Sequence, residues 1–190
     1  MLKWALLNGC PKNSAICSNA ALGGHLEVLK WARENKMEWT YYTCAYAARN
    51  AHIHVLKWAR ENGCDWNSET CIEAAGNGHL EVLKWARSNG CHWNSKVSLV
   101  TAANGHLKVL KWAYENGCKM NESICKDAIR NGHVHVFRWA KENNVGCDEE
   151  AVAMAQERWP ELERCRPASP RSDGDSQNCH TILETPELFV

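Results

Sequence analysis

The chain of 190 residues lacks net charge, since 22 lysine and arginine residues balance 22 aspartate and glutamate residues. No overall field would therefore draw in nucleic acid or acidic lipid. No apolar run reaches the roughly 18 residues that a membrane-spanning helix needs. The N-terminal apolar run, which breaks at Asn8, is too short for a secretory signal. These absences predict a cytoplasmic or nuclear protein without membrane attachment.

A repeat with a fixed interval of 27 residues runs through the sequence. Its clearest copy is GHLEVLKWAR, between Gly78 and Arg87. A fixed period of this length is typical of stacked supersecondary units. Columns of histidine, glycine and asparagine keep the same register. The tryptophans that mark the period are Trp4, Trp31, Trp58, Trp85, Trp112 and Trp139.

Eleven cysteines could indicate a disulfide framework, but most of them follow the repeat. Cysteine that recurs at a structural period is most simply a small buried hydrophobe, kept as a thiol in a reducing compartment. We therefore expect buried, unbonded cysteines. One column contains Cys10, Cys64, Cys91 and Cys118, and the other contains Cys17, Cys44, Cys71 and Cys125.

Each copy of the repeat predicts two short helices. In the copy that begins at Asn67, this side chain can accept a hydrogen bond from the free N–H groups of a helix start. A helix over 68–76 then ends at Asn77-Gly78, where glycine allows a positive φ. A second helix follows over 80–88. The predicted cap column is Asn13, Thr40, Asn67, Asn94, Asn121 and Asp148.

The string AAGNGHLEVLKWARSNGCHWN resembles the ankyrin repeat, and the likeness recurs in every full copy. The period is 27 residues rather than about 33, and the Thr-Pro-Leu-His start of the first helix is missing. The resemblance implies an all-α fold, an α-solenoid of stacked helix-turn-helix ankyrin-like repeats with few hairpins. We assign residues 1–159 to this array, with a truncated first repeat. Residues 160–190, rich in proline, serine and charge, are expected to form a disordered C-terminal tail.

The histidine and cysteine columns could supply metal ligands or catalytic groups, but their position in the repeat explains them better. Zinc ligands lie about 2.1 Å from the ion, whereas packed helices are roughly 8 to 10 Å apart, so histidines of successive copies cannot share a metal. Each histidine is expected to form a hydrogen bond at the turn between helices. Cys64, Cys71 and His79 could supply a thiolate and a base, but all three lie on repeat columns. We predict no catalytic, cofactor or metal site, and no enzyme.

Two further columns leave alternatives open. Lys30, Lys57, Lys84 and Lys111 could form a basic stripe for nucleic acid, but glutamates at helical spacing favour a solvated, ion-paired face. Trp39, Trp66 and Trp93 could stack nucleic-acid bases, but they are better explained as aromatic packing between repeats. Nucleic-acid binding is thus the less favoured reading.

The exposed arc of the first helices carries residues that the repeat does not dictate. These positions change from copy to copy and include apolar side chains that solvent alone would not favour. Aligned by a stack, they would form an apolar strip with charged ends, as at a protein interface. Alternatively, they have drifted on a face without a ligand or are covered by a neighbouring segment. The positions are Tyr42, Ala45, Tyr46, Arg49, Glu69, Ile72, Glu73, Gly76, Lys96, Leu99, Val100, Ala103, Ser123, Lys126, Asp127 and Arg130.

We therefore predict a monomeric, non-enzymatic scaffold that binds another protein through this face. The alternatives are a nucleic-acid-binding module and a purely structural repeat fragment. The residues that we predict to contact the partner are Tyr42, Tyr46, Arg49, Ile72, Glu73, Leu99, Val100, Lys126, Asp127 and Arg130.

Overall fold

The computed structural model describes residues 14–163, which form eleven α-helices and one 3₁₀ turn, without a strand. The predicted all-α class is confirmed for this range. The first repeat, which we predict to be truncated, lies outside it. Of the predicted tail, residues 160–190, only residues 160–163 are described, and they form the 3₁₀ turn. The helices are α2 (Ser14–Leu22), α3 (Leu26–Glu34), α4 (Tyr41–Arg49), α5 (Ile53–Glu61), α6 (Ser68–Gly76), α7 (Leu80–Ser88), α8 (Ser95–Ala103), α9 (Leu107–Glu115), α10 (Ile124–Arg130), α11 (Val134–Glu142) and α12 (Glu149–Arg158), followed by η1 (Pro160–Glu163).

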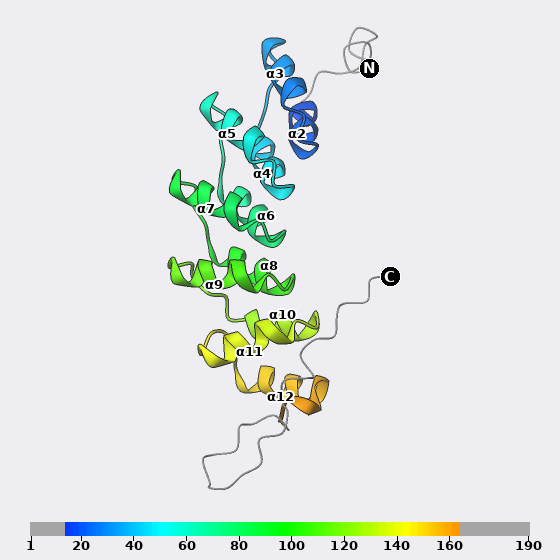
Figure 1. Cartoon of the computed structure of the whole chain (residues 1–190), viewed down its shortest axis with the longest axis vertical. Coiled ribbons are helices and arrows are strands. Elements are labelled where there is room, and N and C mark those ends of the chain that lie inside the picture. The colour runs from blue at the N-terminus through cyan, green and yellow to red at the C-terminus, as the bar shows by residue number, and fades with distance from the viewer. Residues whose placement is uncertain (1–13, 164–190) are drawn as a thin grey trace, which may run out of the picture.

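The helices form antiparallel pairs that stack in two rows (Figure 1). The first helices, α2, α4, α6, α8, α10 and α12, pack one against the next along one row. The second helices, α3, α5, α7, α9 and α11, each pack against the first helix of their own pair and form the other row. Fully buried alanines, such as Ala47, Ala48, Ala74 and Ala75, allow the first helices to approach closely.

Helix starts and stops follow the local signals in most copies. The predicted helices 68–76 and 80–88 are α6 and α7. In the cap column, the side chain accepts a hydrogen bond from a backbone N–H two or three residues later in Asn67, Asn94, Asn121 and Asp148. The prediction is wrong at Thr40, whose side chain makes no capping hydrogen bond. At Asn121 the capped turn precedes α10, which begins only at Ile124. Asn13 lies outside the described residues.

The segments that join each second helix to the next first helix are called crossings here, and a tryptophan packs in each of the three N-terminal ones. Trp66, in the crossing before α6, packs edge to face against Trp85 of α7 with ring centroids 5.8 Å apart. The guanidinium of Arg60 lies 4.3 Å from the centre of the Trp66 ring. The predicted packing between repeats is confirmed for this pair. Trp39 with Trp58 and Arg33, and Trp93 with Trp112 and Arg87, repeat the arrangement.

Histidines of the repeat column form hydrogen bonds to the preceding repeat. The Nε2 atom of His106 lies 3.1 Å from the carbonyl oxygen of Gly76, which ends α6, the first helix of the preceding repeat. The predicted hydrogen bond is therefore present, but it links two repeats rather than closing a turn within one. Gly78 has a φ of 78°, and a Cβ there would lie 2.8 Å from the His106 ring. The same bond is made by His52, His79 and His133.

Candidate functional site

The first-helix face, defined as the outward arc of α4, α6, α8 and α10, carries all ten predicted contact residues. Tyr42, Arg49 and Arg130 are exposed, and the others are partly buried. Because the four helices pack in sequence order, these residues follow one another along a single row. The row has an aromatic end on α4, an apolar centre on α6 and α8, and a charged end on α10.

Three tyrosines form the aromatic end. The ring centroids of Tyr42 and Tyr46 are 5.7 Å apart, and those of Tyr41 and Tyr42 are 4.3 Å apart. Tyr42 is 45% exposed, which is unusual for a large apolar side chain in this structure. A hydrogen bond with Tyr42 raises the pKa of Tyr41 above its ordinary value. Tyr41 was not among the predicted contacts, although its column departs from serine at this copy (Ser14, Tyr41, Ser68, Ser95, Glu122), and this departure could have identified it.

The apolar centre is narrower than predicted, because part of it is used between helices. Ala45 is only 1% exposed and Gly76 is buried, so neither lies on the outward arc where we placed it. Val100 packs on Gly76, where an added Cβ would lie 3.3 Å from Val100 Cγ2. Ile72 also packs against the core. Ala45 and Gly76 are buried because the backbones of successive first helices approach closely. On α8, Leu99 and Val100 remain partly exposed.

An ion pair connects the aromatic end with the centre. The Nε atom of Arg49 lies 3.8 Å from a carboxylate oxygen of Glu73 on the next first helix. The two side chains are 51% and 26% exposed, so their attraction contributes only about 0 to 1 kcal/mol. Both groups can therefore exchange this bond for one to a partner at little cost.

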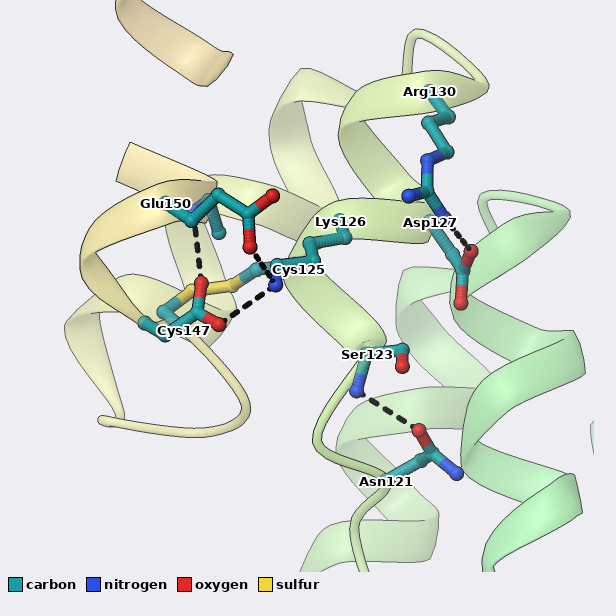
Figure 2. Close-up of polar contacts among 10 residues, drawn as sticks. Asn121, Ser123, Cys125, Lys126, Asp127, Arg130, Cys147 and Glu150 are labelled. Atoms are coloured by element: carbon teal, nitrogen blue, oxygen red, sulfur yellow. Dashed lines mark hydrogen bonds and ion pairs between the residues drawn. A yellow bond between two sulfur atoms is a disulfide. The ribbon is translucent and has the colours of Figure 1, made fainter. Parts of the chain in front are cut away.

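The charged end is already occupied by α12. The Lys126 ammonium lies 2.8 Å from a carboxylate oxygen of Asp148. It also pairs with Glu150, as Figure 2 shows. These bonds raise the pKa of Lys126, and the Lys126 ammonium lowers the pKa of Asp148. Arg130 contacts Asp127 within α10 at 3.4 Å. The sequence did not indicate that the Lys126 charge would be neutralised by the next repeat.

A disulfide joins Cys125 of α10 to Cys147, in the crossing before α12 (Figure 2). The prediction that Cys125 is an unbonded thiol is therefore wrong. Six other described cysteines are free and buried, as predicted, and burial raises the pKa of Cys118 to about 11. They are Cys17, Cys44, Cys64, Cys71, Cys91 and Cys118. Cys10, also predicted to be unbonded, lies outside the described residues.

The groups considered for catalysis point to separate partners. The Cys71 thiol faces the Cys91 carbonyl, the Cys64 thiol faces the Thr40 carbonyl, and the His79 ring bonds to the Arg49 carbonyl. Between residues 14 and 163, no three His, Cys, Asp or Glu side chains are grouped so as to hold a metal ion. No helix in the same range is long and apolar enough to cross a membrane.

The basic stripe of the second helices is largely engaged in contacts within the protein. Lys30 pairs with Glu27 at 2.7 Å, and Lys84 pairs with Glu81 at 2.8 Å. The guanidinium of Arg87 lies over Trp93 and donates to the Cys91 carbonyl oxygen at 2.5 Å, and Arg33 and Arg60 make the same contacts. A hollow of about 450 Å³ between α3 and α5 is lined by Lys30, Arg33, Glu34, Trp58 and Asn62. Its mixed charge gives no selective site for phosphate.

Comparisons with known proteins add no family. A scan of the chain against protein-family models finds no match, and a search among curated proteins finds no relative. The helical repeat is therefore supported by the period of the sequence and by the repeated packing of helix pairs.

Proposed function

We propose that the chain is an α-solenoid of short, ankyrin-like repeats that binds another protein through its first-helix face. What supports this proposal is a contrast within each repeat. The columns that pack between repeats recur almost unchanged, whereas the outward positions of the first helices change from Tyr42 to Glu69 to Lys96. Stacking does not dictate these outward residues, so a surface that recognises a partner explains their variety best.

The mechanism of binding would be preorganisation. Helices locked by buried alanines, cross-repeat histidine bonds and tryptophan clamps present their outward side chains at set spacing. Little conformational entropy is then lost when a partner docks. The exposed Tyr42 and its neighbour Tyr46 provide large contact area with few rotatable bonds. We propose these tyrosines and Leu99 as the anchors, with Arg49 and Glu73 as the polar rim.

The accompanying proposals are a monomeric protein of the cytoplasm or nucleus without catalytic activity. Nucleic-acid binding is the weaker alternative, because Lys30, Lys84 and the arginines of the second helices already have partners within the protein. Lys57 and Lys111 are the lysines of the stripe that could still contact nucleic acid. Neutralising these two residues would abolish a salt-sensitive affinity for nucleic acid if there were one.

The test compares two triple variants in affinity capture from cell lysate with mass spectrometry. The face variant carries Tyr42→Ser, Tyr46→Ser and Leu99→Ser. These sites avoid Ile72 and Val100, which pack between helices and would confound binding with stability. The matched control variant changes residues of the second helices. Circular dichroism first establishes that all samples are equally helical.

The control variant carries Lys108→Ser, Lys111→Ser and Glu115→Ser, at exposed positions of the opposite row. The proposal requires a protein that the wild type and the control retain and the face variant loses. Retention by all three, or loss only in the control, would assign binding elsewhere.

A further inference from the structure

The crossing between α11 and α12, residues 143–148, differs from the three N-terminal crossings in the residue that anchors it. The three N-terminal crossings place Trp39, Trp66 or Trp93 under an arginine. The equivalent position in the last crossing is Cys147, and the arginine column there contains Lys141. Lys141 lies over Phe137 of its own helix, 6.0 Å from the ring centre. The aromatic clamp is therefore missing at this crossing.

The cysteine of the crossing has also moved along the chain. In earlier crossings, the thiols of Cys64 and Cys91 face the carbonyl oxygens of Thr40 and Asn67, at 3.5 and 3.3 Å. Val145 occupies that column in the last crossing, and the sulfur lies two residues later. This shift brings Cys147 to Cys125, with Cα atoms 5.2 Å apart, a separation that suits a disulfide.

Val145 of this crossing is buried in the core, but the polar contacts beside the disulfide are weak individually. The backbone N–H of Cys125 donates to the Gly146 carbonyl at 3.3 Å. Asp148 and Glu150 pair with Lys126, but both carboxylates are more than half exposed, and such ion pairs contribute little. The disulfide thus provides a covalent anchor at the position where the three N-terminal crossings have an aromatic clamp.

We propose that the Cys125–Cys147 disulfide is a redox-controlled clip that determines whether Lys126 is available on the first-helix face. When the clip is closed, the carboxylates of Asp148 and Glu150 pair with the Lys126 ammonium and neutralise it. Figure 2 shows Glu150 and Lys126 beside the disulfide. When it is open, the crossing loosens, the carboxylates withdraw and the ammonium is free. The consequence for binding rests on the proposed function: the open form favours a partner segment that offers a carboxylate to Lys126.

A small dithiol can open the clip by thiol–disulfide exchange. Its thiolate attacks the sulfur of Cys147, which is partly exposed, whereas Cys125 is fully buried. The protein S–S bond breaks, and its electron pair goes to the Cys125 sulfur, which takes up a proton. The second thiol of the reductant then displaces Cys147 from the mixed disulfide. The products are two protein thiols and one oxidised, cyclic reductant, so two electrons have moved from the dithiol to the protein.

The test measures the reactivity of the Lys126 amine in the full chain, without a partner. The protein is oxidised with glutathione disulfide, and one half is then reduced with dithiothreitol. Both halves are acylated briefly with an N-hydroxysuccinimide ester, and labelled peptides are quantified by mass spectrometry. Reduction should raise the rate at Lys126 at least about threefold, because local opening exposes the amine. Lys96, exposed on the same face, serves as the internal control and should not change.

A Cys147→Ser variant should show the faster Lys126 rate with or without reductant. Its substitution lies at a partly exposed position, so folding should be retained. Equal Lys126 rates before and after verified reduction would overturn the proposal, as would failure of glutathione disulfide to form the Cys125–Cys147 peptide. Because no partner is involved, this result is independent of the capture experiment, and either proposal can fail alone.

Discussion

Replacing Trp85 with alanine tests the clamp between repeats most directly. Trp85 is partly buried, packs edge to face on Trp66 and lies 5.9 Å from the Lys57 ammonium. Counting only about 100 Å² of lost ring burial at about 25 cal/mol per Å² gives about 2.5 kcal/mol. The aromatic pair adds about 0.5 to 1.5 kcal/mol. Trp85→Ala should therefore lower the free energy of unfolding by about 3 to 4 kcal/mol.

The assay is equilibrium unfolding in urea, followed by circular dichroism, with Lys84→Ala as the matched control. Lys84 precedes Trp85 on the same helix and makes only an exposed ion pair with Glu81, so its loss should cost about 0 to 1 kcal/mol. A Trp66→Met variant, which introduces the residue found at Met120 in this column, should give an intermediate loss. If Trp85→Ala cost no more than Lys84→Ala, packing of the crossing tryptophans could not be what holds repeats together.

Three further predictions concern single positions. Asn67→Ala should cost about 0.5 to 2 kcal/mol in denaturant melts, because it removes a capping bond of 2.9 Å, whereas Thr40→Ala, which removes none, should be nearly neutral. Ala51→Gly should stabilise the fold by about 0.5 to 1 kcal/mol, because Ala51 has a φ of 59°; a lower melting temperature would contradict this. Lys126 lowers the pKa of Asp148, so the stabilising effect of Asp148 is present above the ordinary carboxyl pKa and is lost as pH falls through the lowered value. The difference in melting temperature between wild type and Asp148→Asn should accordingly be present at about pH 6 and shrink as the pH falls below the ordinary carboxyl pKa.

Helix boundaries could be predicted because they depend on neighbours in the chain. Asn67 caps α6, and Asn77-Gly78 ends it, as the local pattern indicated. The burial of Ala45 and Gly76 could not be predicted from the local sequence pattern. Helical phase places both on the outward arc, but the distance to the next first helix depends on side-chain volumes in another repeat. The surface available at the candidate site is smaller as a result.

At the charged end of the candidate site, contacts between repeats likewise could not be predicted from the sequence. Lys126 and Asp127 vary between copies, which marked them as candidates, but the pattern could not indicate that Lys126 would meet Asp148 of the next repeat. Cys147 stands in the column that contains Trp39, Trp66 and Trp93 and then Met120, so it was an irregularity visible in the sequence. Its partner became evident only when the crossing was placed against α10.

The sequence by itself determined the period, the paired helices and the columns that pack, because each repeat encodes its own caps, stops and apolar faces within 27 residues. The tertiary structure decided which varied residues remain available. Contacts such as Lys126 with Glu150, or Cys125 with Cys147, join residues more than 20 positions apart. They depend on how closely successive helices approach, and this distance is set by packing rather than by the local chain.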